Sequence, residues 1–178
     1  RYRMEKIYFR SSVYRKKFFQ IKTSIIQDNG EKHVVKEAVY PLGIEHIKNI
    51  YNNEKLIKKI LLNENITYGT YKEGAYITEF HEGKTLGALM YQCLLNGQVE
   101  KYKNYQKIWK KLIVGENNLI KFSYTENFKK IFGVDDEDLL GLPSTKISNI
   151  DCSSDNIIFN DKGQIKVIDY EWVYDFPV

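Results

Sequence analysis

Two polar residues near the end of the chain have the types and the spacing of a divalent-cation site. Asp169 follows Asn156 by thirteen positions. Between them lie two apolar runs, NIIF and QIKVI, joined by the turn-forming stretch NDKG, and this pattern predicts a β-hairpin. Pairing of the two strands brings Asn156, at the start of one, near Asp169, at the end of the other. An amide oxygen and a carboxylate at one sheet edge suit Mg²⁺, which takes phosphate oxygens or water in its remaining positions.

A second charged pair is expected between a strand and a helix. From Glu45 to about Asn63 the apolar residues follow a helical period and form one stripe, made of Ile47, Ile50, Ile57 and Leu61. At 100° per residue Glu54 falls in the middle of that stripe, whereas Glu45 points to the opposite side. A buried carboxylate costs several kcal/mol unless it is paired, so Lys36 on the preceding strand is the expected partner. The alternative is that Glu54 lies at the edge of the stripe and reaches water.

The remaining pattern predicts an α+β chain with two parts. Strands are expected at KIYFR, at FFQIKTSII and KHVVKEAVY around an Asp-Asn-Gly turn, and at ITYGTY and AYITEF around Lys-Glu-Gly. Helices are expected at Thr85–Leu94 and Val99–Val114. In the second helix the apolar stripe consists of Tyr102, Tyr105, Trp109 and Leu112. The change near residues 81–83 divides a strand-rich domain, 1–80, from a helix-rich domain, 81–178.

Composition excludes several function classes. The net charge of +4 over 178 residues is mild for a nucleic-acid-binding protein, so no nucleic-acid partner is expected. Charged residues interrupt every apolar stretch, so no transmembrane segment or signal peptide is expected and a cytoplasmic location follows. Cys93 and Cys152 have no metal-type spacing and are expected to be reduced. Because the chain begins at Arg1, we expect it to be a piece of a longer protein.

The last part of the chain resembles a known catalytic segment. The stretches NIDCSSDNIIF and IKVIDYEW resemble the catalytic segment of the protein-kinase-like fold. The residues that carry this resemblance are Asp151, the Asn five positions after it and Asp169. Within that fold they resemble the branch that includes aminoglycoside phosphotransferases and choline kinases, which place an aromatic residue and often Glu after the metal-binding Asp. The ending IDYEWVYDFPV is most similar to kinase-like domains attached to bacterial glycosyltransferases and methyltransferases of surface-polysaccharide synthesis.

The resemblance implies a two-lobed fold with an antiparallel N-lobe sheet, a truncated helical C-lobe, and ATP and Mg²⁺ as cofactors. By this resemblance Asp151 orients an acceptor hydroxyl and receives its proton, while Asn156 and Asp169 hold Mg²⁺ on the nucleotide phosphates. Lys36, in the strand VVK, contacts the phosphates and pairs with Glu54.

The nucleotide base is assigned by the same resemblance. Val34 lies on the same strand face as Lys36 and would cover the adenine. The segment YITEFHEG is similar to the last N-lobe strand and the hinge, where backbone groups of Glu79, Phe80 and His81 would bind the adenine edge.

The chain departs from the family pattern at two points. The loop SSVYRKK between the first two strands contains no glycine, although the family has a glycine-rich phosphate lid there. Its serines, Arg15 or Lys16 are the alternative phosphate contacts. Asn149 stands where protein kinases have His, a residue that organises the loop and does not react.

The residue pattern and the resemblance together predict an ATP-dependent phosphotransferase that acts on a hydroxyl of a small molecule or glycan. The resemblance implies a sugar of a bacterial surface polysaccharide as the acceptor. One alternative is a pseudokinase, a binding module that accompanies a fused or associated glycosyltransferase. A second is a nucleotide-sugar transferase that uses Asp136 and Asp138 as an Asp-x-Asp metal motif, although capping of an acidic helix explains these residues better. Asp151 or Asp169 taken alone is also explained as a turn cap; the joint spacing favours the site.

Overall fold

The computed structural model describes residues 5–178 and has an α+β fold, with an antiparallel sheet and four α-helices in that range. The chain forms two compact units. The first extends to Glu54 and includes Thr67–Glu82, and the second consists of Lys55–Ile66 and Gly83–Val178. The second unit therefore contains the short segment 55–66 as well as the C-terminal half of the chain.

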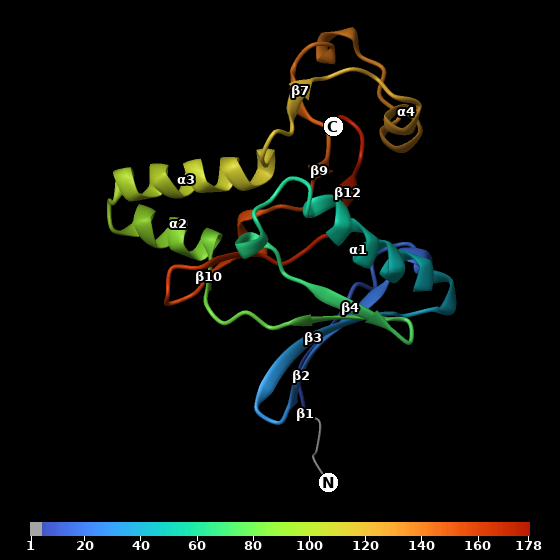
Figure 1. The fold of residues 1–178 in the computed structure, drawn as a ribbon, viewed down its shortest axis with the longest axis vertical. Coiled ribbons are helices and arrows are strands. Elements are labelled where there is room, and N and C mark those ends of the chain that lie inside the picture. Colours follow the sequence, from blue (N-terminus) through green and yellow to red (C-terminus); the bar gives the residue numbers. More distant parts are fainter. Residues whose placement is uncertain (1–4) are drawn as a thin grey trace. The chain divides into compact units, whose positions relative to one another are not determined.

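The first unit is built on a five-stranded antiparallel sheet (Figure 1). In spatial order the strands are β1 (Glu5–Ser11), β2 (Ile21–Asp28), β3 (Glu31–Ala38), β5 (Ala75–Glu79) and β4 (Gly69–Lys72). The β2–β3 hairpin turns at Asn29 and Gly30, whose φ angles of 51° and 87° are left-handed. Asn and Gly adopt this conformation readily, so the predicted hairpin is confirmed.

Helix α1 (Ile44–Ile57) supplies the other half of the first unit's core. Its residues Ile47 and Ile50 are fully buried and pack with Ile21 and Tyr76. The expected continuation of the helix to Asn63 is wrong. The chain leaves the helix after Ile57, and the carbonyl of Ile60 accepts a hydrogen bond from Glu116 N at 2.6 Å. A tertiary partner thus replaces the continued helical bonding that the local pattern favours.

The start of the predicted strand FFQIKTSII also needs correction. Strand β2 begins at Ile21, and Lys17–Phe19 instead forms a 3₁₀ turn within the β1–β2 loop. The side chain of Gln20 donates to two carbonyls of that loop, those of Val13 and Arg15. These side-chain hydrogen bonds within the loop have no signature in the strand pattern.

The second unit is organised around α2 (Leu86–Leu95) and α3 (Val99–Val114), which pack on each other. It also contains α4 (Glu126–Phe132) and three small antiparallel sheets. In the first, β10 (Ile157–Phe159) pairs on one side with β6 (Lys84–Thr85) and on the other with β11 (Ile165–Val167). The other two sheets are the pair of β9 (Ser148–Asn149) with β12 (Val173–Tyr174) and the pair of β7 (Leu119–Lys121) with β8 (Pro143–Thr145). The fully buried centre includes Ile66, Leu86, Ile157 and Val167. The predicted α3 stripe faces this core, which confirms the helical reading of that segment.

A smaller aromatic cluster lies outside that centre. Phe122, Phe128 and Phe176 are buried together, and Tyr174 packs against them. Burial raises the pKa of the Tyr174 hydroxyl above its ordinary value. None of the helices described between residues 5 and 178 combines the length and the apolar character needed to cross a membrane.

Candidate metal centre

The predicted hairpin that positions the site is present in the second unit. Ile157 on β10 lies opposite Val167 on β11, and Ile168 N donates to the carbonyl of Asn156 at 3.0 Å. Asn156 and Asp169 therefore lie at the same end of the strand pair, as the sequence pattern predicts.

Three carboxylates gather at this end of the hairpin. One carboxylate oxygen each from Asp151, Asp169 and Glu171 lies within 4.8 Å of the other two. Glu171 is only 5% exposed, and the other two residues are half-buried. Sequence reasoning did not assign a role to Glu171. The available signal was its position, two residues after Asp169 and between Tyr170 and Trp172, where a charged side chain is unusual unless it has a partner.

Asn149 ties the two carboxylate-bearing segments together. Its amide nitrogen donates to the carbonyl of Asp169 at 3.0 Å, and its amide oxygen accepts from Asp151 N at 3.2 Å. Asn149 is buried and belongs to β9, which pairs with β12 through Val173. One side chain thus links the backbone of Asp151 to that of Asp169.

Two further hydrogen bonds fix the orientation of the oxygen donors. The amide nitrogen of Asn156 donates to the carbonyl of Asp151 at 2.8 Å, which orients the amide whose oxygen is the candidate ligand. Glu171 N donates to Asp169 Oδ1 at 3.1 Å, so the Asp169 carboxylate closes a tight local turn. Backbone groups therefore hold both side chains in place.

Cys152 lies next to Asp151 but does not offer a thiolate. Burial, and after it the negative charge of Asp151, raises the pKa of its thiol to about 12. Its carbonyl accepts a hydrogen bond from Trp109 Nε1 at 2.8 Å, which anchors the loop to α3. The donors at this site are consequently oxygens, which fit a hard cation such as Mg²⁺ better than zinc or another thiolate-binding metal.

In the first unit, the structure brings Lys36 and Glu54 to one buried tyrosine. Lys36 on β3 lies directly opposite Tyr76 on β5, so their side chains share a sheet face. Tyr76 OH donates to Glu54 Oε2 at 3.2 Å, and Gly69 N donates to the same oxygen at 2.8 Å. Lys36 is 8% exposed and Glu54 is 3% exposed, so Glu54 does not reach water from the edge of its stripe.

The residues expected to bind a base also lie in the first unit. Val34 faces Thr78 on β5, on the same side of the sheet as Lys36. Strand β5 ends at Glu79, and Phe80 N donates to the carbonyl of Lys32 at 3.1 Å, which extends the strand pairing by one bond. The Phe80 amide is therefore engaged, whereas the roles of Glu79 and His81 stay predictions.

The predicted site residues thus fall into two sets. Lys36 and Glu54 belong to the first unit, and Asp151, Asn156 and Asp169 belong to the second. Their action on one ligand stays a prediction. The alternative metal motif has a structural role: Asp136 Oδ1 accepts from Asp138 N at 3.0 Å and caps the 3₁₀ helix Glu137–Leu139. Neither belongs to the carboxylate cluster found among the described residues.

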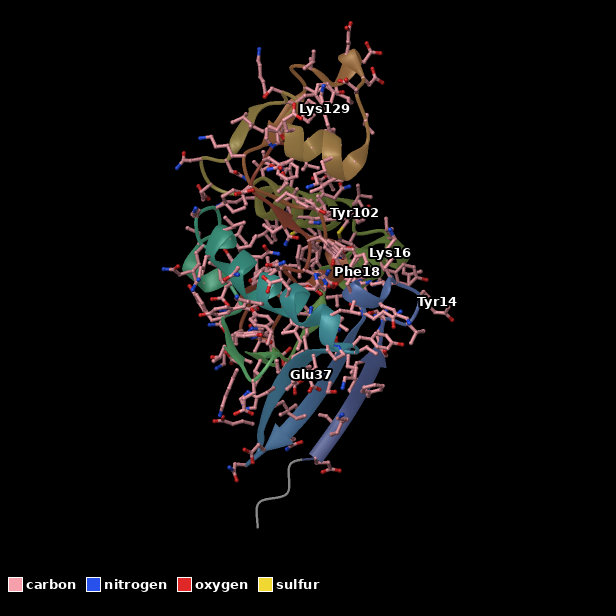
Figure 2. The ribbon with its side chains drawn as sticks, turned by 90° about the vertical axis from the view of Figure 1, so that its right-hand side faces the viewer. Tyr14, Lys16, Phe18, Glu37, Tyr102 and Lys129 are labelled. Carbon is pink, nitrogen blue, oxygen red and sulfur yellow. The ribbon has the colours of Figure 1, made fainter. Side chains whose placement is uncertain are left out.

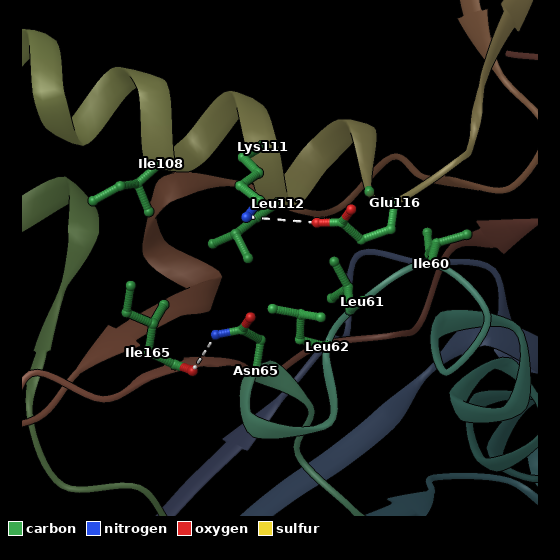
Figure 3. A pocket seen from close by; sticks show the side chains of 10 residues that line it. Ile60, Leu61, Leu62, Asn65, Ile108, Lys111, Leu112, Glu116 and Ile165 are labelled. Atoms are coloured by element: carbon green, nitrogen blue, oxygen red, sulfur yellow. Dashed lines mark hydrogen bonds and ion pairs between the residues drawn. The ribbon is translucent and has the colours of Figure 1, made fainter.

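The second unit also contains a cavity of about 220 Å³ that includes none of the predicted site residues (Figure 3). Its walls are mainly aliphatic. Two polar interactions lie along it, a Lys111–Glu116 ion pair at 3.5 Å and a hydrogen bond from Asn65 Nδ2 to the carbonyl of Ile165 at 3.0 Å. Its lining polar groups thus bind one another.

No protein-family model matches the sequence, and no curated protein matches it. Among solved structures, the chain is similar to Rv3197 from Mycobacterium tuberculosis, determined in complex with erythromycin. The TM-score is 0.52 and the sequence identity is 10%; the similarity covers 88% of this chain and 44% of Rv3197. The chain therefore spans less than half the length of that protein. At this identity the likeness concerns the fold alone.

Proposed function

We propose that this chain is an ATP-dependent phosphotransferase domain of the two-lobed kinase-like fold, which transfers the γ-phosphoryl group to a hydroxyl. The observation that carries the proposal is the gathering of Asp151, Asp169 and Glu171 within 4.8 Å at one end of the β10–β11 hairpin. Asn156 lies at the same end, so the site offers carboxylate and amide oxygens together. This donor set suits Mg²⁺ on nucleotide phosphates.

The residues of the second unit have separate roles in this proposal. Asn156, Asp169 and Glu171 would hold Mg²⁺, which would neutralise phosphate charge when bound. Asp151 orients the acceptor hydroxyl and accepts its proton as the acceptor oxygen bonds to the γ-phosphorus and the bond to the β–γ bridging oxygen breaks. Asn149 acts as a positioning residue, because it bonds to the backbone of both Asp151 and Asp169.

The first unit contributes the cation. Lys36 contacts the phosphates, and Glu54 holds that region of the sheet in place through Tyr76. Val34, on the same sheet face, covers the base, and backbone groups of Glu79 and His81 bind its edge. Catalysis would then come mainly from positioning and charge neutralisation, since the transferring phosphoryl group needs little covalent assistance.

The resemblance of the catalytic segment extends the proposal to a substrate class. A sugar hydroxyl of a bacterial surface polysaccharide is the proposed acceptor, in the cytoplasm and alongside a glycosyltransferase. The similarity in fold to Rv3197 supports only the architecture.

A transfer assay tests this function. We expect the protein to release or transfer the γ-phosphate of ATP with Mg²⁺, and we expect Asp151→Asn to lower the rate by at least about 10²-fold while nucleotide still binds. Asp161→Asn is the matched control, because Asp161 lies in the exposed β10–β11 turn and the same charge is removed. An activity that Asp151→Asn leaves unchanged removes Asp151 from its proposed role.

A pseudokinase is the second candidate, and the β1–β2 loop favours it. That loop has no glycine, and the hydroxyl of Ser12 both accepts from Ile21 N and donates to the carbonyl of Ile21. This serine is therefore engaged by the backbone and is a poor phosphate contact. Mg²⁺-dependent nucleotide binding without any phosphate release by the full-length protein would favour this candidate.

A further inference from the structure

Net positive charge gathers in residues 5–22, which comprise β1, the following loop and the first two residues of β2. Residues 5–22 contain one acidic residue, Glu5, and six basic ones, Lys6, Arg10, Arg15, Lys16, Lys17 and Lys22. This segment has a net charge of +5, whereas the whole chain has +4, so the remaining residues together are net negative. Such an asymmetry indicates a surface for an anionic partner.

The same segment exposes large apolar side chains. Tyr14 is 102% exposed, so no neighbouring group covers any of its ring. The other exposed apolar residues of the segment are Ile7, Tyr8, Phe9, Val13 and Phe18. Figure 2 shows Tyr14 projecting from the loop, with Lys16 and Phe18 also labelled there. Six exposed apolar residues interspersed with six basic ones along one short segment need an explanation beyond a solvated edge strand.

The loop that carries these residues is held firmly from within. Gln20 Nε2 donates to the carbonyls of Val13, at 3.2 Å, and Arg15, at 2.6 Å, and Ser12 bonds to the backbone of Ile21. Phe19 packs edge-on against His46 of α1 at 5.0 Å between ring centres. The loop therefore presents Tyr14, Lys16 and Phe18 from a fixed base.

We infer that β1 and the loop 12–20 form a docking surface for an anionic lipid bilayer. Lysine and arginine are attracted to acidic headgroups, and tyrosine and phenylalanine partition into the membrane interface. This combination produces reversible attachment without a membrane-spanning helix. The inference does not depend on the proposed phosphotransferase function.

Other occupants fit the surface less well. A second copy of the chain would bring two strongly positive segments together, which like-charge repulsion opposes. Single-stranded nucleic acid would use the aromatic rings, but the aliphatic Ile7 and Val13 offer bases no stacking surface. A bilayer interface accommodates aliphatic, aromatic and basic side chains together.

Vesicle co-sedimentation tests the inference. We expect the protein to bind vesicles of phosphatidylcholine mixed with phosphatidylserine, to bind phosphatidylcholine alone at least about tenfold more weakly, and to be released by raised salt. Two double variants should each weaken vesicle binding on the order of tenfold. The first combines Tyr14→Ser with Phe18→Ser, and the second combines Lys16→Ser with Lys17→Ser.

Matched variants separate this surface from general charge and apolarity. One control removes the same charge from α3, with Lys107→Ser and Lys110→Ser. The other removes exposed apolar side chains from α2, with Leu94→Ser and Leu95→Ser. Both should leave vesicle binding unchanged. Circular dichroism and thermal unfolding verify that each variant is folded.

Any of three results from the binding assays would overturn the inference, and a fourth follows from nucleotide binding. The three are no vesicle binding by the wild type, equal loss in the α2 or α3 variants, and loop-dependent binding of a single-stranded oligonucleotide without vesicle binding. Mg·ATP binding, measured on the same proteins, keeps the two proposals apart. The variant Lys16→Ser with Lys17→Ser distinguishes them. If this variant loses nucleotide binding and keeps vesicle binding unchanged, the loop binds nucleotide and the membrane role is overturned.

Discussion

At the scale of single residues, one side chain amide sets the geometry of the candidate metal centre. Asn149 bonds to the backbone at Asp151 and at Asp169, which are far apart in sequence. The backbone positions that carry these two carboxylates are therefore linked to each other. This arrangement limits the reorganisation needed when charge is neutralised at the site.

Because Cys152 is buried, the free energy of unfolding is expected to fall as the pH rises above 9. Its folded pKa of about 12 lies above the ordinary thiol value of 9.0, so the unfolded chain loses the thiol proton first. Its contribution to stability is complete below pH 9 and is lost as the pH rises from 9 toward 12. Cys152→Ala should lose less stability over this range in urea unfolding, while Cys93→Ala provides the control. If the free energy of unfolding fell equally with pH in wild type and Cys152→Ala, the pKa of this thiol would not be raised in the folded protein.

The carboxylate of Glu54 is expected to be essential to the first unit. Glu54→Ala leaves Tyr76 OH and Gly69 N without the oxygen to which both donate. We expect a loss of about 2–4 kcal/mol in the free energy of unfolding. Glu45→Ala, on the exposed face of the same helix, should change it by less than about 0.5 kcal/mol. Equal effects of the two substitutions, measured by urea denaturation, would contradict the buried role of Glu54.

At the scale of elements, the close approach of β6 to β10 requires a glycine. Gly83 has a φ of 150°, and a Cβ at this position would lie 2.2 Å from the carbonyl oxygen of Phe159. The strand β10 that it touches begins immediately after Asn156. Packing at Gly83 thus supports the hairpin that carries the candidate site.

Gly83→Ala should therefore destabilise the second unit. Gly163→Ala is the matched control, because Gly163 has a φ of 75° but open space around its Cα. Both substitutions impose left-handed strain, and only Gly83→Ala adds a clash, so we expect an additional loss of about 1–3 kcal/mol. Thermal or urea unfolding provides the comparison. A larger loss for Gly163→Ala would mean that the close packing at Gly83 is unimportant.

Elements with local signals were predictable from the sequence, and those determined by distant partners were not. The turn at Asn29 and Gly30 carries its own conformational preference, and the burial of Glu54 follows from helical periodicity. The end of α1 depends on a hydrogen bond between Ile60 and Glu116, which no local pattern reports. Glu171 was missed for a related reason, since its place in the carboxylate cluster arises only when the segment after β11 meets β9, through the bond from Asn149 to the carbonyl of Asp169.

At the scale of the whole molecule, the chain divides its predicted chemistry between two compact units. The buried lysine and glutamate belong to the sheet unit, and the oxygen cluster belongs to the unit of α2 and α3. If both sets serve one nucleotide, Lys36→Met and Asp169→Asn should each weaken the binding of that same nucleotide. The fold similarity to Rv3197 covers both units, since it extends over 88% of the chain.

The most direct measurement of the central claim is Mg²⁺-dependent binding of ATP, determined by calorimetry for wild type, Asp169→Asn and the exposed control Asp161→Asn. The wild type and the control should bind ATP with equal affinity when Mg²⁺ is present, and Asp169→Asn should bind it at least about tenfold more weakly. Equal affinity in all three proteins, or no effect of Mg²⁺ on the wild type, would contradict the assignment of the carboxylate cluster to a metal–nucleotide site.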